Sequence, residues 1–289
     1  MNIYFIIIIG IILFNYALSF IVRTLNLRAL DPKLPPEFAE FYDQEKYIKS
    51  QEYTKTNSKF SYITSTFSLI ISLVFILGGL YNTFDLYARN LGYGEIVTGI
   101  FFFALLTVIT DLLQMPFSLY STFVIEEKYG FNKTTLKTFA LDKIKGWFML
   151  IIVGGALLSL IIWFYQWAGS SFWLYAWAVI AVFSVVMNMF YAKLIVPLFN
   201  KQTPLEGGSL RQKIEAYASK VGFKLDNIFV IDGSKRSTKA NAYFSGFGSQ
   251  KRITLYDTLI NNLENDEIVA VLAHEVGRYK RKHIIFNLC

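Results

Sequence analysis

Long runs of residues without a charge occupy most of the first 192 positions and predict helices that cross a membrane. A transmembrane helix needs roughly 20 consecutive apolar residues to span a hydrocarbon core about 30 Å thick. The last run has 47 residues, which suits two spans joined by a turn at Gly169-Ser170-Ser171. We therefore expect five spans, which lie in residues 3–22, 60–84, 96–124 and, as a pair, 146–192.

Two other interpretations of these runs fit the sequence less well. Buried helices of a soluble protein are shorter and alternate with polar faces, which these runs lack. The first run is not typical of a secretory signal peptide, because residues 1–22 contain no Lys or Arg and because the apolar part exceeds the usual length of about 7–15 residues. We expect the first helix to be retained.

The overall composition agrees with a membrane protein. The chain of 289 residues is 54% hydrophobic and 17% charged, whereas a soluble domain carries about 25% charged residues. This composition excludes a disordered chain, a coiled coil and an ordinary soluble enzyme. The single cysteine, Cys289, excludes a disulfide scaffold.

The distribution of basic residues predicts the orientation in the membrane. Basic residues alternate between many and few from one connection to the next, and connections rich in Lys and Arg stay in the cytoplasm. The N-terminus is therefore expected outside and the region after Lys193 inside. That region mixes nine acidic with fifteen basic residues, so the net charge of +7 indicates attraction to anionic lipid and no nucleic-acid partner. The counts of Lys and Arg are seven in 23–59, one in 85–95, five in 126–145, none at 169–171 and fifteen from 193 onward.

Asp111 is the one charged residue in the run 96–124. A charged group at that depth is costly and usually faces a protein interior or a water-filled cavity. It could line a polar chamber. Alternatively, it could separate a span from an amphipathic stretch, because Pro116 follows five residues later. Both interpretations stay open.

The region after Lys193 has the pattern of a small α/β segment. Leu210, Ile214, Tyr217 and Val221 recur at helical spacing, and Gly222 is a plausible C-cap. A second helix is expected to be capped by Asn265 and to bury Ile268, Leu272 and Val276. The expected strands are residues 227–232, 242–247 and 252–256, the last two joined as a hairpin through 248–250.

The second helix carries His274-Glu275, the opening of the metalloprotease motif H-E-x-x-H. In that motif two histidines four residues apart bind zinc on one helix face, and the Glu is the general base. The fourth residue here is Arg278, whose guanidinium has no lone pair to offer a metal. His283 lies half a turn away and about 13 Å along an intact helix. The residues alone therefore supply one good zinc ligand, His274, where a catalytic site needs three.

Further stretches resemble the CAAX prenyl protease 1 (Ste24-like) family of integral-membrane M48 zinc metallopeptidases, and they occur in that family's order. They are YIKSQEY (47–53), IEEKYGFN (125–132), PLFNKQTPL (197–205), DGSKRS (232–237), NAYFSGF (241–247), LYDTL (255–259) and the helix that begins with His274-Glu275.

This resemblance implies seven helices around a large chamber, with the zinc site facing the cytoplasm. It implies endoproteolysis near the C-terminus of membrane-associated, prenylated proteins, so the expected partners are the bilayer and such a C-terminus, bound by a monomer. By the family pattern His274 is a zinc ligand and Glu275 the general base. Asn241, Ala242 and Tyr243 lie in a strand that resembles the family's substrate-pairing strand.

The sequence departs from the family pattern at two places. Arg278 replaces the second histidine ligand, and the chain stops at Cys289 before the later Glu ligand. We therefore expect an α-helical multi-pass membrane protein with a small cytoplasmic α/β metalloprotease segment that is inactive as written. The alternatives are a degenerate pseudoprotease that binds peptides, a gene fragment, and a transporter or assembly factor. The expected parts are a membrane domain (1–192), a peptidase segment (193–283) and the start of a truncated sixth span (284–289).

Overall fold

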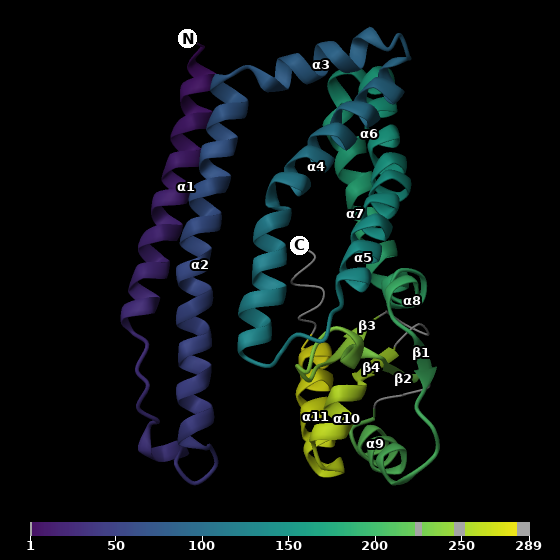
Figure 1. Cartoon of the computed structure of the whole chain (residues 1–289). Helices are drawn as coiled ribbons and strands as arrows, with labels where there is room; N and C mark the ends of the chain where they lie inside the picture. The colour runs from purple at the N-terminus through teal and green to yellow at the C-terminus, as the bar shows by residue number, and fades with distance from the viewer. Residues whose placement is uncertain (1, 223–226, 246–251, 282–289) are drawn as a thin grey trace. The chain divides into compact units, whose positions relative to one another are not determined.

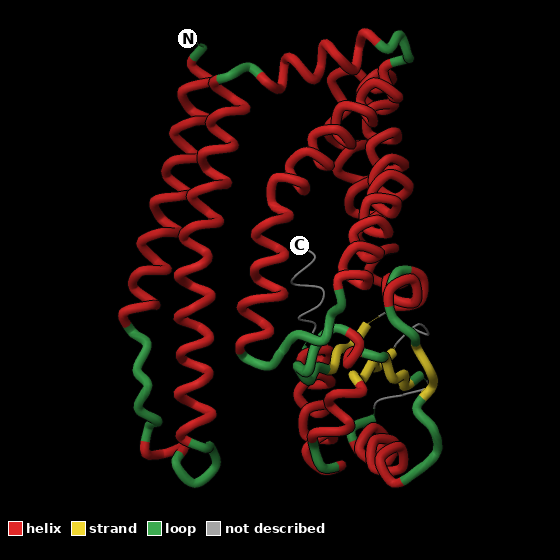
Figure 2. Tube along the Cα trace, in the orientation of Figure 1, coloured by secondary structure: helices red, strands yellow, loops and turns green. Residues whose placement is uncertain are grey.

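The chain divides into two compact units, which are described separately. The structure is a computed structural model that describes residues 2–222, 227–245 and 252–281, with the backbone alone for 278–280. One unit comprises Met1–Tyr93 with Phe101–Gly130, and the other comprises Gly94–Ile100 with Phe131–Cys289. In the described residues the first unit is helical, and the strands lie in the second (Figures 1 and 2).

Helices α1 and α2 of the first unit lie side by side along much of their length (Figure 1). Polar side chains join them within an apolar surface: the hydroxyls of Tyr16 and Thr66 are 2.7 Å apart, and those of Thr24 and Tyr62 are 2.8 Å apart. Interhelical hydrogen bonds of this kind stabilise helix pairs in a bilayer. The elements of this unit are α1 (Ile3–Arg28), η1 (Pro36–Phe38), α2 (Gln44–Leu77), α3 (Leu80–Asn90), most of α4 (Glu95–Tyr120) and η2 (Ser121–Glu126).

The prediction of one span over residues 60–84 is wrong at its end. Helix α2 stops at Leu77, and α3 begins at Leu80 as a separate helix. Gly79 between them has φ +67°, a left-handed conformation that glycine adopts without the steric cost of a side chain. The break between α2 and α3 depends on the backbone conformation at Gly79. A run without charged residues gives no information about that conformation.

The helix continues without a break at Asp111, and both interpretations of this residue stay predictions. Helix α4 runs through Asp111 and Pro116 and continues directly into η2. The wider π-helical turns of η2 follow shortly after Pro116, in keeping with the local adjustments that accommodate proline in membrane helices. The amide of Gln114 in the same stretch donates to Ser68 Oγ of α2 at 2.8 Å.

The apolar part of the second unit is a helical hairpin. The turn predicted at residues 169–171 is confirmed: η4 (Gly169–Ser171) separates α6 from α7, which pack together. Aromatic rings crowd this turn, with Trp163 stacked on Trp167 and Phe164 stacked on Tyr175. The elements are α5 (Leu136–Met149), η3 (Leu150–Gly154), α6 (Gly155–Ala168), η4, α7 (Phe172–Leu194) and α8 (Val196–Phe199).

Four helical stretches in the described residues are long and apolar enough to cross a membrane. The fourth contains both helices of the hairpin, so the predicted number of five crossings stays a prediction. The stretches are Ile3–Arg28, Gln44–Leu77, Glu95–Glu126 and Leu136–Phe199.

The remainder of the second unit is a four-stranded sheet with helices against it. Strand order is β1-β2-β4-β3; β2 and β4 are parallel, and the other two pairs are antiparallel. The predicted strands and helix are confirmed where described, but the C-cap of the helix is Val221, and Gly222 follows it with φ +63°. The predicted connection at 248–250 lies outside the described residues. The elements are β1 (Gln202–Pro204), α9 (Ser209–Lys220), β2 (Ile228–Ile231), η5 (Gly233–Lys235), β3 (Ala242–Ser245), β4 (Arg252–Tyr256), α10 (Asp257–Asn262) and α11 (Asn265–Lys280).

Helix α11 buries the face that the sequence predicts. Ile268, Leu272 and Val276 are each at most 3% exposed, and the first two belong to a core shared with α9 and the sheet. The predicted cap is wrong by one residue. The carbonyl of Glu264 accepts the first helical bond, whereas the side chain of Asn265 donates to Ser209 of α9. Asn is a preferred N-cap residue, but the side chain of Asn265 makes a tertiary contact and does not cap the helix.

Candidate functional site

Strand β3, which carries the predicted substrate-pairing residues, lies at one edge of the sheet formed by the described strands. It pairs with β4 on one side, with Ala242 opposite Leu255 and Tyr243 opposite Thr254. An edge strand presents unpaired backbone groups to which an extended peptide can add. The position of β3 therefore suits the predicted role of Asn241, Ala242 and Tyr243.

Two residues of β3 direct their backbone groups away from β4. The Tyr256 amide donates to the Asn241 carbonyl at 3.0 Å, and such bonded positions alternate with positions whose N–H and C=O point away. The outward positions are therefore Ala242 and Phe244. The Asn241 side chain covers one outward group, because its Oδ1 accepts the Ala242 N–H at 2.9 Å. An added strand could replace this contact.

Helix α11, which carries the predicted catalytic residues, packs beside β3. Phe244 packs against the cluster formed by Ala218 of α9 and Val276, the residue after Glu275. His274 is exposed and lies opposite the buried face of the helix, whereas Glu275 is partly exposed at the edge of that face. The structure therefore brings the two predicted sets of site residues onto neighbouring elements.

The described residues do not fit a zinc ion on their own. A catalytic zinc site uses three protein ligands, and no group of three or more His, Cys, Asp or Glu side chains that could hold a metal occurs among the described residues. His274 is the imidazole that α11 offers, and Arg278 one turn later is a cation. His283 and Cys289, both considered as ligands from the sequence, lie outside the described residues.

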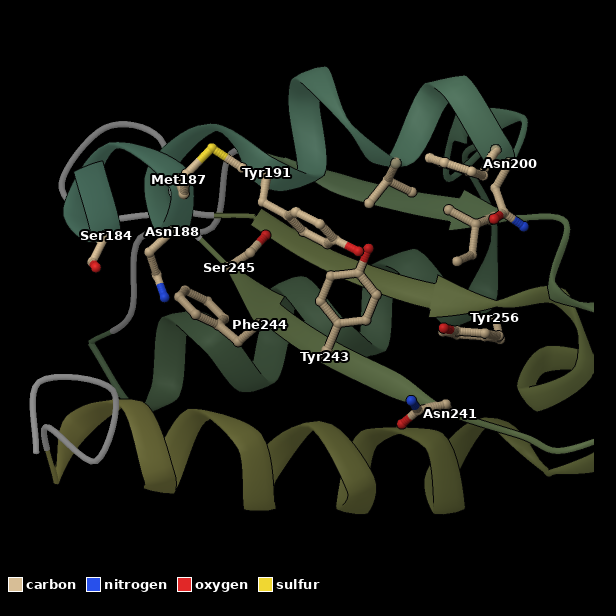
Figure 3. A pocket seen from close by; sticks show the side chains of 13 residues that line it. Ser184, Met187, Asn188, Tyr191, Asn200, Asn241, Tyr243, Phe244, Ser245 and Tyr256 are labelled. Atoms are coloured by element: carbon tan, nitrogen blue, oxygen red, sulfur yellow. The ribbon is translucent and has the colours of Figure 1, made fainter. Parts of the chain in front are cut away.

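A cavity of about 690 Å³ separates the sheet from α7 and α8. Figure 3 shows Tyr191 of α7 and Tyr243 of β3 pointing into it from opposite walls. Residues 184–191 were expected to lie in a span, and their role in this cavity was not predicted. The available signal was the polar pair Ser184 and Asn188, one helical turn apart in an otherwise apolar run.

Burial shapes the electrostatics of this cavity and its surroundings. Burial raises the pKa of the Tyr243 hydroxyl, so the group stays neutral. Burial also lowers the pKa of Arg252, whose guanidinium donates to the Ala192 carbonyl and to Gln202 and lies 3.9 Å from the centre of the Phe229 ring. The charged guanidinium of Arg252 therefore contacts neutral groups, namely two oxygen acceptors and an aromatic ring.

Arg236 forms hydrogen bonds with three segments of the second unit: α5, the end of α8 and the stretch before α5. Its guanidinium makes two bonds to Asp142 of α5, at 2.7 and 2.8 Å, and a third to the Phe199 carbonyl at the end of α8. The bonds to Asp142 raise the pKa of Arg236. The carbonyl of Arg236 also accepts bonds from Lys133 and Thr134. The stretch 232–237 was recognised in the sequence as a motif, but this role was not.

Comparison with known proteins finds one family along the chain. Residues 23–201 match the family described as "CAAX prenyl protease N-terminal, five membrane helices", and residues 204–289 match "Peptidase family M48". The CAAX prenyl protease 1 homolog of Arabidopsis thaliana is 39% identical over 97% of this chain and 68% of its own length. CAAX prenyl protease 1 of Saccharomyces cerevisiae is 38% identical over 88% of this chain and 59% of its own length.

A solved structure agrees with these matches. The crystal structure of S. mikatae Ste24p superposes with a TM-score of 0.93 at 37% identity, covering 100% of this chain and 69% of that one. The chain thus spans between 59% and 69% of the length of the relatives named here.

Proposed function

The chain belongs to the CAAX prenyl protease family of M48 metallopeptidases, and on that premise we propose that it binds the C-terminal segment of membrane-associated, prenylated proteins. The segment lies as an extended strand along β3, beside helix α11. The observation that carries this proposal is the position of β3 at one edge of the sheet formed by the described strands, where the backbone groups of Ala242 point away from β4. Main-chain pairing explains how such a site can accept many sequences.

Cleavage depends on the residues of α11. By the family pattern Glu275 is the general base and His274 a ligand of the zinc cofactor. With Arg278 in place of the second histidine, we propose that this chain holds zinc weakly and retains its peptide without cutting it. Losing a direct ligand should weaken zinc binding beyond the roughly 10–100-fold that loss of a supporting contact costs.

Endoproteolysis by this chain is the second candidate function. It is favoured by the exposure of His274 and the partial exposure of Glu275 on a helix that packs beside β3. The two candidates differ in zinc affinity and in cleavage, and not in peptide binding.

Peptide binding can be tested with a synthetic C-terminal peptide methylated at one backbone nitrogen at a time. Strand pairing uses every second amide, so methylation at alternate positions should weaken binding about tenfold, and the neighbouring positions serve as matched controls. Binding to the full chain in lipid nanodiscs is measured by fluorescence anisotropy. Ala242→Pro, which removes an outward donor, should weaken binding of every peptide. Equal effects at all positions would refute strand pairing.

We also propose the topology that the basic residues predict: five spans within residues 1–192, the N-terminus outside and a peptidase segment from 193 to 283 in the cytoplasm. The aromatic rings around η4 support a position of that turn at a membrane surface, where Trp and Tyr concentrate. In a Cys289→Ser background, Ser170→Cys should react with an impermeant maleimide in intact cells. Lys201→Cys should react only after permeabilisation, and the reverse pattern would invert the topology.

A further inference from the structure

Basic side chains from three separate segments of the second unit surround the start of its apolar hairpin. Residues 146–192 carry no charge. The segments 131–145, 198–201 and 232–239, which lie outside that run, contain eight basic residues and only two acidic ones, Asp142 and Asp232. The basic cluster consists of Lys133, Lys137, Lys143, Lys145, Lys201, Lys235, Arg236 and Lys239.

Direct contacts hold the loop 232–239 against the stretch that leads into α5. The backbone N–H of Lys133 donates to the carbonyl of Arg236 at 3.0 Å. The ammonium of Lys239 lies 4.8 Å from the centre of the Phe131 ring. Residues that are about a hundred positions apart in the chain therefore contribute to one basic surface.

The end of α8 belongs to the same surface. The ammonium of Lys145 on α5 donates to the Leu198 carbonyl of α8 at 2.7 Å, and Lys201 follows three residues later. Lys145 and Lys235 both interact electrostatically with the carboxylate of Asp142. The lysines of α5 and of the loop 232–239 thus lie near one another.

The two carboxylates of these segments are already occupied within the protein. Asp142 accepts both bonds of the Arg236 fork. Asp232 accepts a bond from the Asn200 side chain and another from the backbone N–H of Lys201. In the part of the chain that the structure describes, the exposed ammonium groups of Lys133, Lys137, Lys201 and Lys235 form no ion pair. The basic cluster therefore carries a net positive charge that the protein leaves uncompensated.

Helix α5 indicates the level at which the bilayer begins. Leu141, Ile144 and Phe148 are exposed and share one face of the helix. Lys137 lies on the same face, one turn before Leu141. The first turn of α5 contains no acidic residue, and the N-terminus of a helix adds partial positive charge. An exposed apolar face thus continues directly into a basic one, which is the arrangement that acyl chains and a negative headgroup require.

We propose that the basic cluster binds the headgroup of an anionic phospholipid whose acyl chains lie along the exposed apolar face of α5. Ammonium groups donate charge-assisted hydrogen bonds to phosphate and carboxylate oxygens. Four to eight basic residues beside a membrane helix are typical of such a site, and each contributes about fivefold to affinity. A soluble anion lacks the acyl chains and gains only the electrostatic part. The site involves neither β3 nor α11, so it is separate from the proposed peptide site.

The test measures lipid binding to the full chain in detergent by native mass spectrometry. The probes are phosphatidylserine and phosphatidylcholine with identical acyl chains, and the first phosphatidylserine should bind at least about tenfold more tightly. Lys137→Gln/Lys235→Gln removes exposed charges from two segments and should abolish most of this preference. Lys213→Gln/Lys220→Gln removes the same charge from exposed positions of α9 and should keep it.

Further variants separate charge from folding. Lys137→Arg/Lys235→Arg retains both charges and should keep the preference for phosphatidylserine. Lys133→Gln/Lys201→Gln is a second neutral variant, which should lose the preference if the first fails to fold. Inorganic phosphate in excess should leave the lipid bound.

Four results would each overturn the proposal. The unaltered chain could bind the two lipids equally well. The α9 control could lose the preference as fully as Lys137→Gln/Lys235→Gln, which would assign the effect to net charge. The arginine variant could lose it, which would show that charge is not the cause. Complete displacement of phosphatidylserine by inorganic phosphate would identify a site for soluble anions.

Discussion

Replacing Arg278 by histidine should raise the zinc affinity of the chain by about 100-fold or more. The backbone of α11 is helical from Asn265 to Lys280, so residue 278 lies one turn after His274 on the same face. The substitution removes a cation that repels the metal and adds a second imidazole at the spacing of H-E-x-x-H. Affinity is measured by competition with a chromophoric zinc chelator.

The control for this prediction is Lys280→His, which adds a histidine to the same helix six residues after His274, on a different face. It should leave zinc affinity within a few-fold of the starting chain. Any cleavage that appears with Arg278→His should vanish when Glu275→Gln is added, whereas a contaminating peptidase would persist. If the unaltered chain already binds zinc as tightly as the variant, Arg278 is no obstacle and endoproteolysis becomes the favoured function.

Breaking the pair between Arg236 and Asp142 should destabilise the second unit by about 2–3 kcal/mol, because a charged group is then left partly buried without its partner. Both side chains are only about a quarter exposed, at 24% and 25%, and the fork of two bonds has the strong bidentate geometry. Asp142→Asn should lower the melting temperature by roughly 5–10 °C. Arg236→Gln should lower it further, since the bond to the Phe199 carbonyl is lost as well.

The matched control is the exposed pair of Lys213 and Asp266, which has the same 2.7 Å separation. Its side chains are 44% and 83% exposed, and such pairs contribute about 0–1 kcal/mol. Asp266→Asn should therefore change the melting temperature little. Thermal unfolding of the double variant Asp142→Asn/Arg236→Gln completes a mutant cycle. Additive losses, or equal losses at the two pairs, would show that Arg236 does not link α5 to the sheet region.

Several features of this protein could be predicted from short stretches of sequence. The runs without charge predicted long apolar helices because a bilayer accepts no other backbone arrangement on its lipid side. The turn at Gly169-Ser170-Ser171 and the buried face of α11 followed from local composition and helical periodicity. The order of the motifs along the chain predicted the family.

Other features were decided by the tertiary structure, because they depend on groups far apart in the chain or on backbone conformation. Gly78 and Gly79 separate α2 from α3 inside a run without charged residues. Arg236 finds Asp142 at a distance of 94 residues along the chain, and the polar face of α7 meets β3 across the cavity only once the hairpin and the sheet are folded. Residue patterns report which side chains prefer burial and which local geometry the backbone favours. The partners that share a cavity or an ion pair are selected by packing, in which every contact depends on the position of the others.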